Sequence, residues 1–217
     1  MVSLQTQTAR GTGRPPRHHD PNIREHLVEV AVELFAGRGY SATSVREIVE
    51  GAGVSKPVLY YHFGSKEGLY LEILRRLERT LAETVANRDA GGGSARERIR
   101  RLALDIYDAF SENSAAVRFL NAVFWGPPQG TPEFDFESLH RPITAAFSGL
   151  VEEGIARGEF RAAAGPELSF AALGALSFAM DFHLAHPDRA PGREGLAKVL
   201  DLVLSGASAP RRGGSCR

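Results

Sequence analysis

Residues 44–66 read SVREIVEGAGVSKPVLYYHFGSK, and this run predicts two short helices joined by a glycine turn. Ser44 and Glu47 form an S-x-x-E capping box, in which the two side chains satisfy backbone N–H groups at the start of a helix. Thr43 is an alternative cap, and the sequence leaves both open. Glycines bracket the turn that follows, because glycine readily adopts the left-handed conformation that closes a helix. Two short helices joined in this way are typical of a helix-turn-helix unit.

The second short helix carries few residues that suit a hydrophobic core. Residues 55–62 read SKPVLYYH, in which only Val58 and Leu59 are aliphatic. If Leu59 packs inward, Tyr60 and Tyr61 turn largely outward, and exposed apolar rings are costly unless they meet another surface. A DNA groove provides such a surface, with phosphates for the hydroxyl groups and thymine methyl groups for the rings. The alternative is that both tyrosines are ordinary core residues.

The rest of the chain repeats its apolar residues with helical period, and no comparable run alternates with period two. We therefore expect an all-α protein. A supporting helix with an apolar face from Ile23 to Phe35 precedes the helix-turn-helix, and a long helix from Ser65 to about Asn87 follows it. Breaks rich in glycine and proline separate the further predicted helices, which lie near residues 95–112, 114–125, 137–157, 166–186 and 193–205.

The chain thus divides into a small helical head and a larger helical body. The expected parts are a disordered basic tail over residues 1–20, a helix-turn-helix domain over 21–66, a larger helical domain over 67–206 and a disordered tail over 207–217. The long helix joins head and body without a flexible linker, so it can transmit movement between them. Arg10, Arg14 and Arg17 allow the first tail to enter a minor groove, although its composition favours simple disorder.

Composition limits the class of protein. The chain has 217 residues, with 26 Lys and Arg against 26 Asp and Glu, so its overall charge does not indicate a nucleic-acid partner. The single cysteine, Cys216, excludes an intramolecular disulfide framework and a cysteine zinc cluster, and it fits a reducing compartment. The longest uncharged apolar stretch, residues 168–180, is shorter than the roughly 18 residues of a membrane span. We therefore expect a soluble cytoplasmic protein with no membrane partner.

The head also carries the residue spacings of a known family. Residues 52–69 follow A-G-V-S-x-x-x-L-Y-Y-H-F-x-S-K-E-x-L, and residues 35–48 follow F-x-x-x-G-Y-x-x-T-S-V-x-x-I. Together they resemble the signature of TetR-family transcriptional regulators over about residues 23–75. Beyond those residues the resemblance extends only to length and helical content. It implies a DNA-binding head and a body that dimerises and encloses an apolar pocket for a small-molecule effector.

The resemblance assigns particular residues to DNA. Those expected at phosphates are Thr43, Ser44, Tyr60, His62 and Lys66. Those expected at base edges are Lys56, Pro57 and Tyr61, with Arg46 reaching either a base or the backbone. For Ser55 and Ser65 plain helix capping is the alternative to a DNA contact, and for Lys66 the alternative is a solvated lysine.

One head covers only a few base pairs, so specific binding usually needs a second head about 34–36 Å away on a palindrome. We therefore expect a homodimer. Small residues spaced by four and an apolar stripe on the last two predicted helices suggest its interface. The candidate interface residues are Ala171, Ala175, Ala179, Leu196, Val199, Leu200 and Val203. The alternative is that these residues form ordinary intrachain core.

The body is rich in aromatic residues, and a few polar ones lie among them. The candidate effector-binding residues are Tyr107, Phe110, Asn121, Trp125, Phe147, Phe178 and His183. For each of them core packing is the alternative. His183 and His186 do not predict a metal site, because no cysteine accompanies them and Pro187 ends the helix. We find no catalytic motif and expect no cofactor and no enzymatic activity.

These features predict a dimeric, ligand-responsive transcriptional repressor that binds a palindromic double-stranded DNA operator. An unidentified effector in the body would tilt the long helix and release the operator. One alternative is a helical-bundle binding protein or enzyme for an apolar compound, which would not retain duplex DNA specifically. Another is a ligand-independent DNA-binding protein, which would have no pocket large enough for a ligand and little operator preference.

Overall fold

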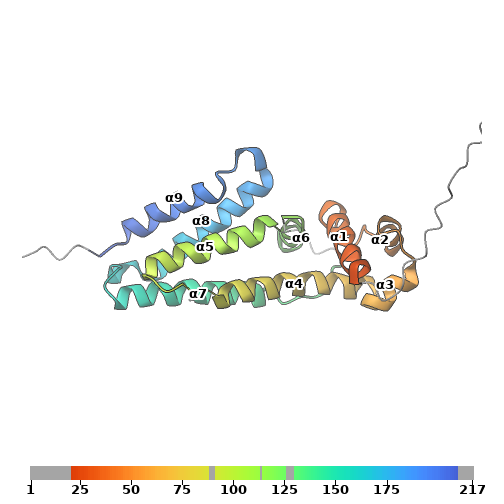
Figure 1. The fold of residues 1–217 in the computed structure, drawn as a ribbon, viewed down its shortest axis with the longest axis horizontal. Helices are drawn as coiled ribbons and strands as arrows, with labels where there is room; N and C mark the ends of the chain where they lie inside the picture. The colour runs from red at the N-terminus through yellow and green to blue at the C-terminus, as the bar shows by residue number, and fades with distance from the viewer. Residues whose placement is uncertain (1–20, 88–90, 113, 126–129, 210–217) are drawn as a thin grey trace, which may run out of the picture.

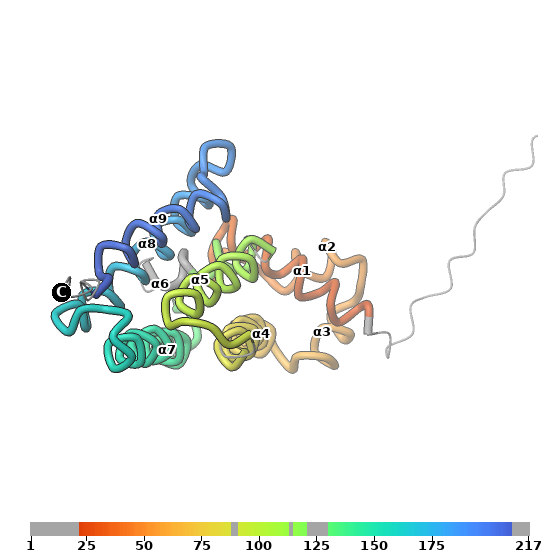
Figure 2. Tube along the Cα trace, turned by 60° about the vertical axis from the view of Figure 1, so that its left-hand side comes forward, coloured from red at the N-terminus to blue at the C-terminus, as the bar shows by residue number. Residues whose placement is uncertain are grey.

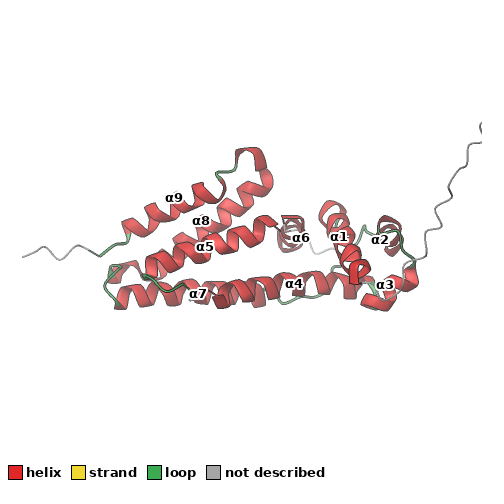
Figure 3. Ribbon diagram, viewed as in Figure 1, coloured by secondary structure: helices red, strands yellow, loops and turns green. Residues whose placement is uncertain are grey.

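The computed structural model describes residues 21–87, 91–112, 114–125 and 130–209, without the side chains of Pro21, Ser114 and residues 121–125 (Figure 1). Within these ranges the chain forms α-helices, short 3-10 turns and one isolated antiparallel bridge. The all-α expectation is therefore confirmed. Figure 3 shows the helices with their connecting loops. The predicted tail over residues 1–20, with Arg10, Arg14 and Arg17, lies outside the described residues.

The head consists of three helices at one end of the molecule (Figure 1): α1 (Pro21–Arg38), α2 (Val45–Gly51) and α3 (Lys56–Phe63). The predicted capping box is present at α2. The Ser44 hydroxyl accepts the N–H of Glu47 at 3.2 Å, and the Glu47 carboxylate accepts the N–H of Ser44 at 2.8 Å. Ser44 is therefore the cap, which resolves the choice between Ser44 and Thr43. Gly53 has a φ of +64° in the turn between α2 and α3, where a side chain would be strained.

The head core extends beyond the predicted boundary at residue 66. Leu27 and Phe35 of α1, Ile48 of α2 and Leu59 of α3 are fully buried in it. The long helix α4 (Lys66–Ala86) adds Leu69, Tyr70, Ile73 and Leu74 to the same cluster. Head and body thus share α4, whose first half belongs to the core of the head.

The body contains five further helices: α5 (Ala95–Glu112), α6 (Ser114–Trp125), α7 (Glu137–Ala156), α8 (Gly165–Ala185) and α9 (Gly192–Gly206). Helix α5 lies in the middle, where it contacts α4, α7, α8 and α9 (Figure 2). Short 3-10 turns, Ala162–Ala164 and Pro187–Arg189, precede and follow α8. A second hydrophobic cluster joins α5, α7, α8 and α9, so head and body have separate cores. The predicted helix limits agree with the observed ones to within about two residues.

Residues 207–209, the first three of the expected disordered tail over 207–217, are held by hydrogen bonds after α9. Ser208 forms the antiparallel bridge with Phe160. The carbonyl of Ala207 accepts the N–H of Arg161 at 3.0 Å, and the N–H of Ala209 reaches the carbonyl of Glu159 at 3.0 Å. These bonds fix the end of α9 against the segment after α7. Residues 210–217 lie outside the described range.

Helix α8 is unusually apolar. Among the described residues, Ala162–Ala185 is the one helical stretch long and apolar enough to cross a membrane by length and composition, and 28% of its apolar window is buried. A core helix of a soluble protein can meet the same criteria, but such a helix is mostly buried. The exposure of so many apolar residues on α8 therefore has to be explained by something other than burial in the core of this chain.

Candidate nucleic-acid interface and ligand cavity

The outer face of α3 presents two phenol rings to solvent. Tyr60 is 47% exposed and Tyr61 58% exposed, whereas Val58 and Leu59 beneath them are buried. The expectation that the tyrosines turn outward is confirmed, and the alternative of core tyrosines is wrong. Lys56 and Pro57 in the first turn of α3 are also exposed. The face therefore combines rings, hydroxyl groups and a cation, which suits a polyanionic surface.

The two predicted cap serines behave differently. Ser65 caps α4, since its hydroxyl accepts the N–H of Gly68 at 2.9 Å. Ser55 stands at the N-cap position of α3 with extended backbone, but its side chain makes no capping hydrogen bond. The capping alternative thus describes Ser65, while the exposed Ser55 hydroxyl is not used by its helix.

Thr43 does not fit the expectation of a phosphate contact through its side chain. It is 1% exposed. Its hydroxyl lies 2.9 Å from the carbonyl oxygen of Gly39 and 3.3 Å from that of Leu34, and it donates to both. Leu34 lies in the last turn of α1, and Gly39 directly follows the helix. Thr43 therefore closes the C-terminus of α1 and cannot turn its hydroxyl toward a ligand outside.

Lys66 is likewise turned into the protein. Its ammonium donates to the carbonyl oxygens of Tyr40 and Thr43, each at 2.9 Å, and lies 4.0 Å from the centre of the Tyr40 ring. Partial burial lowers the pKa of Lys66. Neither a phosphate contact nor a solvated lysine describes this geometry. Lys66 ties the start of α4 to the loop before α2 and so braces the helix-turn-helix.

The remaining predicted DNA residues lie near α3 on the head surface. Ser44 and Arg46 are exposed on α2, and Arg46 pairs with Glu50 at 2.6 Å. His62 is half-buried at the end of α3, and its ring contacts that of Tyr61 at a centroid distance of 5.1 Å. A phosphate would compete with Glu50 for Arg46, and the exchange is easy because exposed ion pairs contribute little stability.

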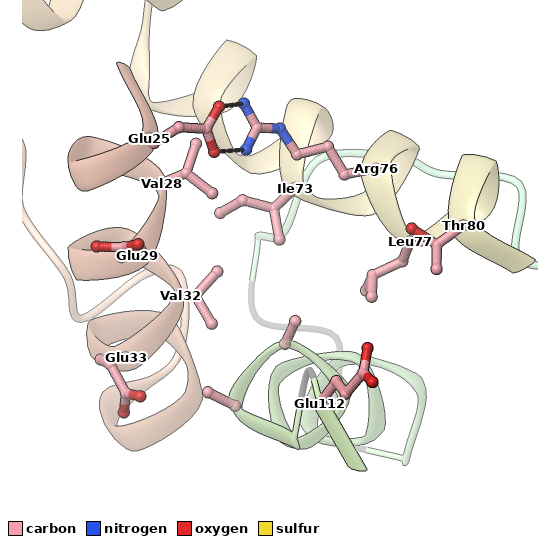
Figure 4. A pocket seen from close by; sticks show the side chains of 12 residues that line it. Glu25, Val28, Glu29, Val32, Glu33, Ile73, Arg76, Leu77, Thr80 and Glu112 are labelled. Atoms are coloured by element: carbon pink, nitrogen blue, oxygen red, sulfur yellow. Dashed lines mark hydrogen bonds and ion pairs between the residues drawn. The ribbon is translucent and has the colours of Figure 1, made fainter. Parts of the chain in front are cut away.

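An ionic network joins α1 to α4 beneath the head. Glu72 of α4 contacts Arg24 at 3.0 Å, Arg76 at 3.1 Å and Arg79 at 3.2 Å. Burial raises the pKa of Glu72, but the hydrogen bonds from these arginines outweigh it and lower the pKa to about 2. Arg76 also holds the Glu25 carboxylate through two hydrogen bonds, one of 2.9 Å (Figure 4). The network fixes the angle between α1 and α4.

Beside this network, α1, α4 and α6 enclose an open crevice of about 540 Å³ (Figure 4). Val28, Val32, Ile73 and Leu77 form its apolar walls. Elsewhere α1 and α6 pack closely against each other, so the crevice is a local opening between these helices.

Helix α6 reaches into the core of the head. Phe119 is fully buried among head residues, with ring-centroid distances of 5.7 Å to Phe35 and 5.1 Å to Tyr70. Phe35 and Tyr70 themselves meet edge to face at 5.9 Å. Burial raises the pKa of Tyr70 to about 12, so its phenol stays neutral. This aromatic cluster of Phe35, Tyr70 and Phe119 couples α1, α4 and α6.

A second cavity, here called the body cavity, has a volume of about 280 Å³ and lies among α4, α5, α6, α7 and α8. Its described lining is mostly apolar and includes Leu81 of α4, Ile106 of α5 and Leu120 of α6. Leu120 and Phe136, which both line it, also pack against the head core. The body cavity therefore lies where the two cores meet.

The predicted effector residues do not surround this cavity. The Tyr107 hydroxyl lies 2.8 Å from Nδ1 of His183, and the Phe110 ring contacts the same imidazole at 5.8 Å. Phe147 is fully buried in the body core, and Phe178 is 70% exposed. None of these five residues is among the described lining, so the body cavity does not support that part of the expectation. The side chains of Asn121 and Trp125 lie outside the described part of the structure.

The exposed face of α8 and α9 corrects the predicted interface. Leu196, Leu200 and Ala179 are buried in the intrachain core, and Ala175 and Val203 pack against it. Only Ala171 and Val199 of the predicted set are exposed. The large exposed residues are Phe170 at 80%, Phe178 at 70% and Leu202 at 75%. Sequence reasoning missed Phe170 and Leu202, although a helix that is apolar on all sides signals burial on both of its faces.

Comparisons with known proteins identify the family of this chain, and the family model matches the head. A family model described as bacterial regulatory proteins, tetR family, matches residues 27–73. The HTH-type transcriptional repressor KstR2 of Rhodococcus jostii is 32% identical over 151 residues, which cover 68% of this chain and 72% of the relative. The HTH-type transcriptional activator FasR of Mycolicibacterium smegmatis is 35% identical over 116 residues, covering 54% of this chain and 53% of the relative.

Solved structures extend the likeness to the whole fold. The ketosteroid transcriptional regulator KstR2 of Mycobacterium tuberculosis superposes with a TM-score of 0.71 at 24% identity. The superposition covers 89% of this chain and 98% of the other. At that identity the match supports the fold of head and body together.

Proposed function

Because the chain belongs to the TetR family of bacterial regulatory proteins, we propose that it is a dimeric repressor released from its operator by a small, largely apolar effector. Membership already makes it a DNA-binding transcriptional regulator rather than an enzyme. The observation that carries the proposal is the family-matched helix-turn-helix with Tyr60 and Tyr61 exposed on α3. We place its action in the cytoplasm, where operator DNA is accessible.

We assign DNA contacts to the exposed residues of α2 and α3. Lys56, Pro57 and Tyr61 lie toward the base edges, and Tyr60, Ser55 and Ser44 toward phosphates, with Arg46 and His62 at the margin. Thr43 and Lys66 brace this surface from within instead of touching DNA. Ser65 has the same supporting role as the cap of α4.

We assign dimerisation to the exposed face of α8 and α9. Phe170, Gly174 and Phe178 follow one another at intervals of four along α8, and Leu202 and Val199 extend the face onto α9. The two helices pack against each other, and we take their exposed apolar residues together as the self-pairing surface. The same two helices of a second copy would cover it as a four-helix interface. A self-pairing face of this kind also explains why α8 is apolar yet largely exposed.

The body cavity is suited to control the head through two helices. A ligand there would touch Leu81 of α4 and Leu120 of α6. Both helices continue into the head core, α4 through Tyr70 and α6 through Phe119. Filling the cavity would therefore shift α6 as well as α4, and the two α3 helices would no longer match successive major grooves. The ligand would thus act on the head through α6 in addition to the predicted tilt of α4.

The relatives favour repression over activation. The KstR2 relative, a named repressor, is matched over 72% of its length, so the match includes much of the body. The FasR relative, a named activator, is matched over 53% of its length. Since the body decides the response to an effector, we give more weight to the longer match.

The test is a selection of bound sequences from a random duplex DNA library, using the full chain. We expect enrichment of a palindrome, with retention that falls steeply as salt rises. Tyr61→Ala and Lys56→Ala should each abolish the enrichment while the protein stays folded, because both side chains are exposed. Folded variants that retain the same sequences at the same salt would refute the assignment of α3 as the reading helix.

A further inference from the structure

One side chain of α1 reaches the last residue of α3. The guanidinium of Arg24 lies over the ring of Phe63, 5.3 Å from the ring centroid. The negative face of an aromatic ring attracts a cation, and a planar, weakly hydrated guanidinium stacks on it better than an ammonium does. Phe63 ends α3 and is half-buried against the head core. Arg24 therefore bridges α1 to the helix that carries the assigned base contacts.

A carboxylate of α4 orients this guanidinium. Nη2 of Arg24 lies 3.0 Å from Oε1 of Glu72, whose side chain is only 18% exposed. Glu72 also pairs with Arg76 and Arg79 of its own helix, so the carboxylate is itself held in place. Because water screens a partly buried pair less than one on the open surface, this contact is stronger than an ordinary surface ion pair. Arg24 is thus fixed at its edge by Glu72 and at its face by the Phe63 ring.

The backbone of Phe63 is held from another side. Its carbonyl oxygen lies so close to Gly68 of α4 that a β-carbon at that position would overlap it. Gly64, with a φ of +73°, turns the chain from α3 into α4, and its N–H donates to the carbonyl oxygen of Tyr60 at 2.8 Å. The end of α3 is therefore held by α4 through the backbone and by α1 through the Phe63 ring.

The position of this end determines where the tyrosines of α3 point. Tyr60 and Tyr61 lie within one turn of Phe63, and a helix of eight residues is only about 12 Å long. A tilt at its C-terminal end therefore moves both rings. Hydrogen bonds to base edges weaken steeply with a wrong angle, whereas attraction to phosphates changes slowly with distance. Loss of the bridge should thus lower sequence-specific binding more than non-specific binding.

Resting on the proposed function, we propose that Arg24 is a positioning residue for sequence reading, which holds the end of α3 through Phe63 and does not itself bind DNA. Lys66 and Thr43 brace the loop before α2, whereas Arg24 acts on α3. Since Glu72 orients Arg24, the orientation of α3 depends on how α1 and α4 meet.

The test compares binding of the full chain to the palindrome recovered by selection and to an unrelated duplex of equal length, over a range of salt concentrations. Arg24→Met removes the charge and the stacking, whereas Arg24→Lys keeps the charge but not the planar group. We expect both variants to lose about tenfold in affinity for the palindrome, the size of one lost base contact. Their affinity for the unrelated duplex and their salt dependence should not change.

A direct phosphate contact by Arg24 predicts a different result. Arg24→Met would then weaken binding to both duplexes and reduce the slope of affinity against salt by about one. Arg24→Lys would bind nearly as well as the unmodified chain, because an ammonium also attracts a phosphate.

Two further substitutions locate the effect. Phe63→Leu removes the ring and should reproduce the loss, and combining it with Arg24→Met should cost no more than either change alone, because both break one contact. Arg79→Met removes another arginine that pairs with Glu72 but leaves the stacked guanidinium in place, so the preference for the palindrome should persist. Thermal unfolding of each variant ensures that binding is measured on folded protein.

The proposal is overturned if Arg24→Lys keeps the full preference for the palindrome, if the unrelated duplex is weakened as much as the palindrome, or if the losses of Arg24→Met and Phe63→Leu add. Selection with the unmodified chain reports separately on the proposed function. If it recovers no preferred sequence, the proposed function fails and this inference fails with it. A recovered palindrome that the Arg24 variants bind with unchanged preference would refute the positioning role alone.

Discussion

The exposed rings of α3 and those of α8 differ in what surrounds them. Tyr60 and Tyr61 carry hydroxyl groups and lie beside Lys56, so their surface can meet charged phosphates as well as apolar base edges. Phe170 and Phe178 have no polar atoms, and the neighbouring exposed residue on α9 is Leu202. Exposure alone therefore does not identify a partner. The chemistry at the edge of the patch distinguishes a surface for a polyanion from a surface for a second apolar face.

The supports of the two surfaces differ as well. The head surface is held from below by polar contacts: the buried hydroxyl of Thr43, the ammonium of Lys66 and the ion pairs of Glu72. The body surface rests on apolar packing, in which Leu196 and Leu200 of α9 are buried against the rest of the body. We expect the head surface to respond to pH and to loss of single hydrogen bonds, and the body surface to respond to a buried charge.

The largest expected effect is on the body surface. Phe178→Asp would place a carboxylate in the proposed dimer interface twice, once from each chain, because a two-fold axis repeats every change. We expect the dimer to weaken by about 4 kcal/mol, roughly a thousandfold in dissociation constant. Light scattering after gel filtration measures it. Ala82→Asp, which adds an acid at an exposed position on α4, should leave the dimer intact. A Phe178→Asp chain that remains dimeric would show that α8 does not form the interface.

The next prediction distinguishes a lysine that stabilises the head, Lys66, from a lysine that contacts DNA, Lys56. Lys66→Met removes the two hydrogen bonds to the carbonyls of Tyr40 and Thr43, so we expect a loss of about 2 kcal/mol in the free energy of unfolding. Lys56→Met removes an exposed cation and should change that free energy by less than about 0.5 kcal/mol, while weakening DNA binding. Urea denaturation of both variants provides the comparison. Equal stabilities would mean that Lys66 does not brace the loop before α2.

A third test measures how the stability contributed by the ion pairs of Glu72 depends on pH. The pKa of Glu72 is about 2 in the folded protein against 4.5 for a free side chain. Its contribution is therefore fully present above pH 4.5 and is lost as the pH falls toward 2. After solvent screening we expect it to amount to about 2 kcal/mol. Denaturation between neutral and acid pH measures it. Glu72→Gln should flatten this part of the profile, and an unchanged slope would assign the acid sensitivity to other groups.

The smallest expected effect comes from two substitutions that remove a hydroxyl group from the α3 surface and add one to the α8 surface. Tyr61→Phe keeps the ring and removes the hydroxyl, so we expect operator binding to weaken by about 1 kcal/mol, roughly fivefold. Phe178→Tyr makes the reverse change on α8 and should leave operator binding nearly unaltered at concentrations where the protein is dimeric. Fluorescence anisotropy at one fixed salt concentration compares them. If Tyr61→Phe binds as well as the unmodified chain, the ring alone makes the contact.

Local features of the structure were predictable because local chemistry determines them. The capping box of Ser44 and Glu47 fixes the start of α2 whatever the rest of the chain does. The outward tyrosines follow from helical geometry once Leu59 faces the core. Helix limits followed from glycines, prolines and apolar period in the same way.

Long-range features could not be predicted from the same patterns. Thr43 and Lys66 carry side chains that suit DNA, and nothing within the sequence shows that carbonyls at Gly39 and Tyr40 bind them first. The lining of the body cavity comes from helices far apart in the chain. On α9 the predicted interface residues Leu196 and Leu200 face the intrachain core, whereas Leu202, which was not predicted, faces out.

The insertion of Phe119 has a consequence for how this chain can be recombined. A fragment that ended after α4 would expose the hollow between Phe35 and Tyr70 that this ring fills, so we expect the head to be unstable as a separate module. Grafting the head onto the body of a relative would then succeed only where the new α6 supplies a ring of matching size. The head and the body of this chain are therefore not interchangeable, since the body supplies Phe119 to the interior of the head.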